Sequence, residues 1–86
     1  MSYPAFFHDD SGCVRFWVNV DGTFIGATVR KDSLHHRYHP RSLDDEPLAT
    51  YLAHAAEIDD AVRRRVAAGS IEPVMLREPD LRSSLT

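Results

Sequence analysis

Three histidines form the first group of side chains whose type and spacing suggest chemistry. His35 and His39 are one helical turn apart, and His36 lies between them. Imidazole nitrogens at this spacing are common zinc ligands, but Pro40 disfavours helical backbone at His39, and no cysteine or acid stands at a zinc-ligand spacing to complete the set. We therefore expect solvated histidines, with no metal and no cofactor.

An aspartate, Asp59, is the second candidate, because it projects into a stripe of apolar residues. One hypothesis pairs its carboxylate with Arg63, one helical turn further on, at the edge of the stripe. The other hypothesis makes it a buried acid with a raised pKa in a pocket. Since no base or nucleophile stands at a matching spacing, we favour the ion pair and predict no catalytic residue and no enzyme.

The helix that should carry this acid is the clearest pattern of the chain, and it is predicted over residues 44–69. At about 100° per residue, one face of it collects the apolar residues Leu48, Tyr51, Leu52, Ala55, Ile58, Val62 and Val66. Asp44 or Asp45 can cap the first turn, and Pro47 is tolerated there because first-turn amides have no partner within the helix. Gly69 suits a left-handed stop. The sequence therefore predicts one long helix.

Residues 14–29 predict a β-hairpin whose register follows from its turn. Asp21-Gly22 is a preferred two-residue loop, because a type I′ turn needs positive φ at both positions. This loop places on one apolar face the pairs Val14–Val29, Phe16–Ala27, Val18–Ile25 and Val20–Thr23. A slip of one residue would scatter these side chains, so the pattern supports the register and predicts that this face packs on the helix.

The opposite face of the hairpin is the candidate interaction surface. It places Trp17 opposite Gly26, with Phe24 on the diagonal and Arg15 beside them. Gly26 leaves room for the indole to lie flat over the backbone. Two interpretations stay open: the aromatic pair is exposed, or it forms a small second core under the N-terminal arm or the C-terminal tail.

A basic segment, residues 30–41, follows the hairpin and suits an acidic or phosphate-bearing partner. It includes one acid, Asp32, and it is predicted to form a short helix that Asp32 or Ser33 caps and Pro40 ends. Leu34 and Tyr38 should turn inward from it. The candidate interaction surface therefore comprises Arg15, Trp17, Phe24, Gly26, Arg30, Lys31, Arg37 and Arg41.

A third strand is predicted over residues 70–78, because apolar and exposed positions alternate from Val74 to Arg77. Pro73 has no amide hydrogen, so this strand is an edge or begins after that residue. The predicted fold is α+β, a small antiparallel sheet of the hairpin plus a third strand, packed on one long and one short α-helix. It makes a single compact domain over residues 1–86, with a frayed tail from about residue 79.

Composition limits the class of protein. The chain has 86 residues, of which 43% are hydrophobic, and this is enough for one modest core. A single cysteine rules out an intramolecular disulfide, and no apolar run is long enough to cross a bilayer. The N-terminus lacks a signal-peptide pattern, so we expect a soluble cytoplasmic protein without membrane contact. A formal net charge of −3 disfavours binding to nucleic acid by bulk electrostatics.

The order of these features resembles a known family. An N-terminal Phe6 precedes Val14-Arg15-Phe16-Trp17 and the Asp21-Gly22 turn, and a basic segment, a helix with Ile58 and Ala61 and a final strand follow. This order is similar to that of the small bacterial proteins grouped as domain-of-unknown-function family 1488. The resemblance implies a compact α+β domain of uncharacterised function, and it carries over no activity, substrate or catalytic residue.

Three function hypotheses follow. The first is a non-enzymatic protein-interaction or regulatory accessory module, which uses its outer sheet face, and the edge of the strand at 74–77, to bind an unknown protein or a second copy. The second is a single-stranded nucleic-acid-binding module, with Trp17 and Phe24 for base stacking and residues 30–41 for phosphates. An enzyme or metal protein comes third, because the sequence offers acid, base and ligand only singly.

Overall fold

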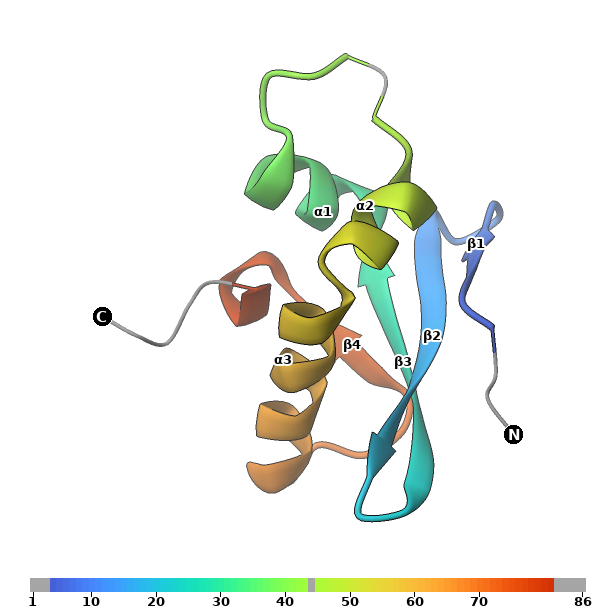
Figure 1. The fold of residues 1–86 in the computed structure, drawn as a ribbon, viewed down its shortest axis with the longest axis vertical. Helices are drawn as coiled ribbons and strands as arrows, with labels where there is room; N and C mark the ends of the chain where they lie inside the picture. Colours follow the sequence, from blue (N-terminus) through green and yellow to red (C-terminus); the bar gives the residue numbers. More distant parts are fainter. Residues whose placement is uncertain (1–3, 44, 82–86) are drawn as a thin grey trace.

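The computed structural model describes residues 4–43 and 45–81, which fold into an α+β structure of two layers (Figure 1). In chain order the elements are β1 (Phe6–His8), β2 (Cys13–Val20), β3 (Thr23–Arg30), α1 (Lys31–Tyr38), α2 (Pro47–Ala53), α3 (Ala55–Ala67), β4 (Val74–Leu76) and the 3-10 helix η1 (Glu78–Leu81). The helices lie on one side of a four-stranded sheet. Within the described ranges, none of them has the length and apolar character that a bilayer crossing requires.

The sheet is mixed, with the strand order β1-β2-β3-β4. β1 and β2 are antiparallel, as are β2 and β3, but β4 runs parallel to β3. The predicted purely antiparallel sheet is therefore corrected. The three α-helices separate β3 from β4 in the chain, and such a crossover is the connection that parallel neighbours need. The N-terminal strand β1 was not among the three predicted strands.

The β2–β3 hairpin has the predicted register. Every pair expected between residues 14 and 29 is present. Asp21 and Gly22 both have positive φ, 52° and 86°, as a type I′ turn requires. Buried side chains line the helix side of the hairpin, and these are Val14, Phe16, Val18, Ala27 and Val29. This face of the hairpin belongs to the hydrophobic core that it forms with the helices.

The hydrophobic core fills the space between the sheet and the helices. Besides the hairpin residues it contains Leu34, Tyr51, Ile58, Ala61, Val62, Val74, Leu76 and Leu81. We call this side of the sheet the inner face and the opposite side the outer face. Because side chains alternate along a strand, the registers place on the outer face Phe6, His8, Cys13, Arg15, Trp17, Asn19, Phe24, Gly26, Thr28, Arg30 and Met75.

The predicted long helix is two helices, α2 and α3, which meet at His54. This residue has φ −122° and ψ 23°, outside the helical range. Its ring stacks on Tyr38 of α1, with a distance of 3.8 Å between the ring centroids. The break changes the helical phase: Tyr51 remains buried and packs on Phe16 with 4.5 Å between centroids, whereas Leu52, predicted in the apolar stripe, is 61% exposed.

The start of α2 lacks the predicted carboxylate cap. Glu46 is the N-cap residue and makes no hydrogen bond from its side chain to the first turn, although Pro47 is at the first position as predicted. Asp45 contacts His35 of α1 instead, and Asp44 lies outside the described residues. The Asp45 carboxylate therefore contacts His35 across the loop, and the first turn of α2 has no carboxylate cap from Glu46.

The end of α3 is the left-handed stop that the sequence predicts. Gly69 has φ 102°. Its amide donates a hydrogen bond to the Val66 carbonyl at 3.0 Å, and the Ser70 amide donates to the Arg65 carbonyl at 2.9 Å. This pair of bonds is a Schellman motif, in which a glycine avoids the steric cost of positive φ.

The short helix α1 matches its prediction except at the cap. Leu34 is fully buried, but the N-cap residue is Arg30, and it makes no side-chain capping bond, so neither of the two proposed caps is used. His39 leaves the helical region, with φ −137° and ψ 53°, as expected for a residue before Pro40.

β4 begins directly after Pro73 and is shorter than the predicted strand. Its side chains alternate as expected, with Val74 and Leu76 buried and Met75 64% exposed. The 3-10 helix η1 follows. Its last residue, Leu81, is only 3% exposed and packs in the core. The tail predicted to start in this segment is therefore corrected at least as far as this leucine.

Candidate interaction surface

The outer face of the sheet is not covered by any helix of the described chain (Figure 1). It therefore keeps side chains of several kinds in contact with solvent. Five of the eight residues predicted for the interaction surface lie on it: Arg15, Trp17, Phe24, Gly26 and Arg30. The structure thus brings the aromatic part of the predicted surface together with two of its cations.

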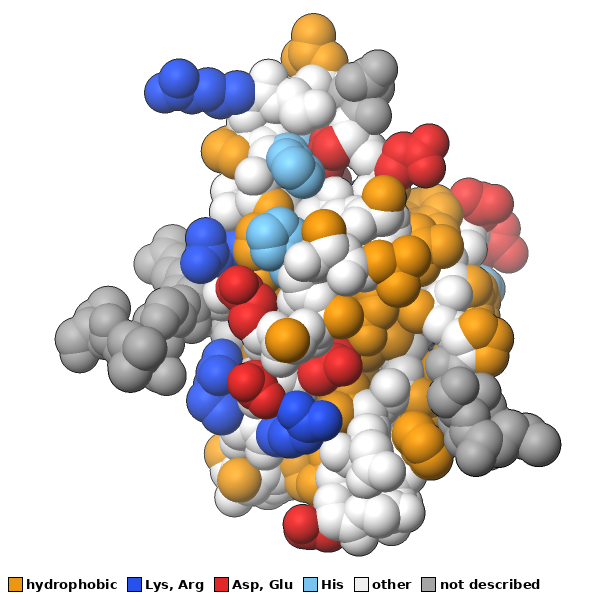
Figure 2. All heavy atoms as spheres, viewed as in Figure 1, with side chains coloured by type: hydrophobic (Ala, Val, Ile, Leu, Met, Phe, Trp, Pro, Cys, Tyr) orange, Lys and Arg blue, Asp and Glu red, His pale blue; other side chains and the backbone are white. Residues whose placement is uncertain are grey.

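The helix side offers a competing apolar surface (Figure 2). Orange side chains gather over α2 and the neighbouring edge of the sheet, whereas charged ones gather over α3. Most apolar residues in this region, such as Phe7, Leu48 and Ala55, are only partly exposed because they pack against the core. Leu52 is the large apolar residue of α2 that stands largely in solvent. This surface is therefore chiefly the rim of the core, and Leu52 serves as a matched control for the outer face.

Trp17 lies on the outer face in contact with a second aromatic residue, Phe6 of β1. The ring centroids are 6.1 Å apart and the planes are inclined by 33°. Trp17 is half-buried, whereas Phe6 remains 41% exposed. Both open interpretations therefore hold in part: the N-terminal arm forms a small aromatic cluster with Trp17, and the cluster still presents apolar area to solvent.

A carboxylate that the sequence analysis did not identify holds the backbone beside Trp17. The Gly26 amide donates a hydrogen bond of 2.8 Å to Oε2 of Glu72. Because β4 begins only after Pro73, this side chain supplies the Gly26 amide with an acceptor where the strand does not. A Cβ atom at Gly26 would lie 3.2 Å from Oε2 and 3.5 Å from Nε1 of Trp17. Glycine within a strand is the sequence signal for such a close approach.

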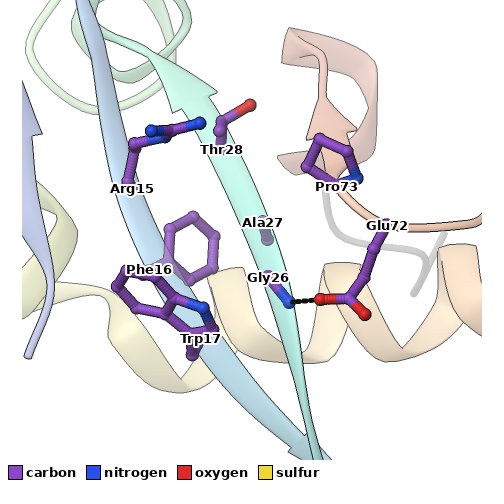
Figure 3. Close-up of a pocket in the computed structure, with 8 residues that line it drawn as sticks. All are labelled: Arg15, Phe16, Trp17, Gly26, Ala27, Thr28, Glu72 and Pro73. Carbon is purple, nitrogen blue, oxygen red and sulfur yellow. Dashed lines mark hydrogen bonds between the residues drawn. The ribbon is translucent and has the colours of Figure 1, made fainter. Parts of the chain in front are cut away.

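These groups line a hollow of about 460 Å³ on the outer face (Figure 3). Its walls are formed by Arg15, Phe16, Trp17, Gly26, Ala27, Thr28, Glu72 and Pro73. Figure 3 shows Arg15 and Thr28 at one end, Glu72 beside Gly26 at the other, and the Trp17 ring next to the glycine. The hollow therefore carries opposite charges at its two ends, and the aromatic ring lies at the Glu72 end.

Arg15 is a cation of the outer face that is available to a partner. Its side chain is exposed, and it forms no ion pair with any other described residue. Arg30 lies on the same face, with its Nη2 atom 4.0 Å from Oδ2 of Asp32, and both of these side chains are largely in solvent. Such an exposed and distant pair contributes little.

The three remaining cations of the predicted surface lie elsewhere. Lys31 lines a separate hollow next to α1, together with His35 and Asp45. The Nε atom of Arg37 donates a hydrogen bond of 3.1 Å to the Leu81 carbonyl on the helix side of the molecule. Arg41 is exposed in the loop between α1 and α2. The basic segment therefore does not form one continuous track beside Trp17.

The edge of β4, predicted as a second pairing site, is engaged by side chains of the same molecule. Nη1 of Arg65 donates to the Met75 carbonyl at 3.2 Å and contacts Oδ2 of Asp80 at 2.6 Å. The Arg77 amide donates to the same carboxylate oxygen at 2.8 Å. Covering an edge with charged groups in this way disfavours pairing with another chain.

The histidines that suggested metal binding have other surroundings. His35 Nδ1 lies 2.8 Å from Oδ1 of Asp45 and so connects α1 to the loop before α2. This hydrogen bond holds the pKa of the Asp45 carboxyl below its usual value. The His35 ring meets the edge of His36, with centroids 5.5 Å apart. Residues 4–43 and 45–81 contain no group of three side chains placed to hold a metal ion.

Asp59 has a different partner from the one predicted. The Tyr51 hydroxyl donates a hydrogen bond of 2.8 Å to Oδ1 of Asp59. Burial raises the pKa of Asp59, while this hydrogen bond and the nearby Arg63 act in the opposite direction. Arg63 itself contacts Asp60 at 2.8 Å and the Asn19 carbonyl at 3.3 Å. The predicted Asp59–Arg63 ion pair is therefore corrected.

Comparison with known proteins leaves the geometry as the basis for interpretation. No family model, no curated protein and no solved structure matches the chain. The resemblance to domain-of-unknown-function family 1488 therefore stays a prediction, and so do the functions considered above.

Proposed function

We propose that the protein is a non-enzymatic interaction module, or regulatory accessory, that binds a partner protein through the outer face of its sheet. The observation that supports this most is the contact between Phe6 and Trp17 on a face that no described helix covers. Arg15 and Glu72 form a charged rim around this apolar cluster. Aromatic residues and arginine are enriched among the residues that contribute most to protein interfaces.

The open shape of the outer-face hollow and the separation of its charged groups also favour binding over catalysis. It is open along one sheet face and holds one carboxylate and one guanidinium at separate ends. Acid–base chemistry needs an acid, a base and a reacting atom brought together at hydrogen-bond distance. Groups at opposite ends of an open hollow suit recognition of a partner with charged side chains.

Affinity capture with matched variants tests the proposal. The bait chains are the wild type, Phe6→Ala, Trp17→Ala and Leu52→Ala, each shown to be folded by circular dichroism. We expect a specific partner to bind the wild type and Leu52→Ala, and to be lost with the two outer-face variants. A partner retained by Trp17→Ala and lost by Leu52→Ala would contradict the proposal and point to the helix side.

Self-association through the same face is a variant of this proposal. Sedimentation of the same four chains then gives a dimer for the wild type and Leu52→Ala and a monomer for Trp17→Ala. A dimer that persists in all four chains would exclude the outer face as the self-association site.

A single-stranded nucleic-acid-binding module is the second candidate, and one observation favours it. Phe6 adds a second aromatic ring next to Trp17, and stacking of bases on such rings is a common mode of single-strand binding. The placement of Arg37 and Lys31 away from this face weakens it. Titration with mixed-sequence oligonucleotides tests it, because real phosphate binding must weaken steeply as salt rises.

A further inference from the structure

We infer that the outer-face hollow recognises an extended segment of a partner protein that carries one acidic and one basic side chain, the acid at Arg15 and the base between Glu72 and Trp17. This inference rests on the proposed function, since it names the chemistry of the segment that the outer face would bind. It differs from a nucleic-acid role, because the Glu72 carboxylate in the hollow would attract a basic side chain and repel a phosphate.

The basic side chain is assigned from the Glu72 end. Oε2 of Glu72 accepts the Gly26 amide hydrogen at 2.8 Å, which fixes the carboxylate at the wall of the hollow. Glu72 forms no ion pair with another described residue. The indole of Trp17 lies on the other side of the same glycine. A fixed carboxylate beside an aromatic ring is a favourable environment for an ammonium or guanidinium group.

The acidic side chain is assigned from the opposite end. Arg15 and Thr28 are direct cross-strand neighbours on the outer face. Arg15 is exposed and has no ion-pair partner among the described residues, so its guanidinium can meet a carboxylate in a two-pronged contact. The Thr28 hydroxyl beside it is a further hydrogen-bond donor. This end therefore accepts a carboxylate and disfavours a second cation.

The spacing of the two ends indicates an extended segment. Arg15 and Trp17 are two residues apart on β2 and share one face, a separation of roughly 7 Å along a strand. In an extended partner, side chains two positions apart also share one face and have the same separation. A partner segment with one acidic and one basic residue, separated by a single residue in either order, can therefore place the acid at Arg15 and the base at Glu72 at the same time. A segment with two acids is rejected at Glu72 by like charge.

An NMR titration of the full, isotope-labelled chain tests this inference. The probes are three blocked tripeptides: acetyl-Glu-Ala-Lys-amide, acetyl-Lys-Ala-Glu-amide and the neutral acetyl-Gln-Ala-Gln-amide. The Gly26 amide is the reporter, because its hydrogen is donated to Glu72. We expect a saturable shift of this amide with at least one charged peptide, and an affinity at least fivefold weaker for the neutral peptide.

Charge-removing variants provide the controls. Glu72→Gln retains an oxygen that can accept the Gly26 hydrogen but removes the charge, and Arg15→Gln removes the opposite charge. Each variant should lower the affinity for the preferred charged peptide by about fivefold. Glu46→Gln, an exposed acid at the start of α2, should leave its affinity unchanged.

Several results would overturn the inference. These are no saturable shift with any peptide, equal affinity for the neutral peptide, and no weakening in either charge-removing variant. Free lysine binding as tightly as the peptides would assign the hollow to a small zwitterion instead. An oligonucleotide that displaces the peptide from the Gly26 site would assign it to nucleic acid.

The outcome for the inference is separable from that for the proposed function. If a captured partner is lost with Trp17→Ala but retained by Glu72→Gln and Arg15→Gln, the outer face is the binding surface and the assigned charges are wrong. If the partner is retained by Trp17→Ala, the proposed function itself fails.

Discussion

The inner and outer faces of the sheet differ although their residues alternate along the same strands. Phe16 on the inner face is 1% exposed and packs on Tyr51. Trp17, the next residue, is half-buried and meets Phe6, which is itself 41% exposed. The difference arises from the helices, which cover one face only (Figure 1). The inner face therefore holds the hydrophobic core, and the outer face leaves apolar side chains partly in contact with solvent.

The largest expected effect is on the inner face. Phe16→Ala should lower the free energy of unfolding by about 3–5 kcal/mol, because it removes a fully buried ring at the centre of the core. Urea denaturation measures this change, and Phe16→Leu, which retains most of the volume, should cost about 1.5 kcal/mol or less. A loss under about 1 kcal/mol for the alanine variant would mean that the inner face does not hold the fold as described.

The matching change on the outer face should affect binding more than stability. Trp17→Ala should cost about 1 kcal/mol of unfolding free energy, because the ring is only half-buried. It should also lower the affinity for the partner by about thirtyfold or more, as expected for an interface hot spot. Denaturation and a binding isotherm give the two values. A stability loss equal to that of Phe16→Ala would remove the distinction between the faces.

A pH-dependent effect follows from Asp59. Its pKa is raised in the folded state, mainly by burial, so ionisation opposes folding and the wild type loses stability as the pH rises through that pKa. Asp59→Asn cannot ionise, and its amide oxygen can still accept the Tyr51 hydroxyl. The variant should be more stable than the wild type at neutral pH, by about 0.5 kcal/mol or less.

The same denaturation series checks this prediction at low pH. The advantage of Asp59→Asn should disappear below the ordinary range of an aspartate pKa, where the wild-type carboxyl is protonated in both states. An advantage that is independent of pH would show that charge at residue 59 is not its cause.

The smallest effect, and one of opposite sign, is expected at Asp45. Its pKa is lowered by the hydrogen bond with His35, so its contribution is present above the pKa of the unfolded chain and is lost as the pH falls through the lowered folded value. The wild type should therefore exceed Asp45→Asn in stability at neutral pH, and the difference should shrink on acidification. A difference that grows in acid would contradict the assigned contact.

The parts of the fold predicted correctly depend on local chemistry. The Asp21-Gly22 turn fixes the hairpin register through backbone conformation alone, and Gly69 fixes the end of α3 in the same way. The alternation that separates Phe16 from Trp17 follows directly from that register. These features need no knowledge of distant residues, which is why the sequence is sufficient for them.

The parts that were wrong or missed depend on contacts between distant segments. His54 interrupts the long helix where its ring stacks on Tyr38 of another helix. The bond from the Gly26 amide to Glu72 joins residues 46 positions apart, and the parallel course of β4 depends on the path of three helices. Neither periodicity nor capping rules describe such contacts, so the hollow could not be recognised before its residues were placed.

The most direct test of the central claim is a map of the partner contact on the labelled chain by amide NMR. The partner is the protein captured by the wild-type bait. We expect the largest shifts on the outer face, at Phe6, Trp17 and Gly26, with residues around Leu52 unchanged. The largest shifts on α2 around Leu52, with Trp17 and Gly26 unaffected, would contradict the account.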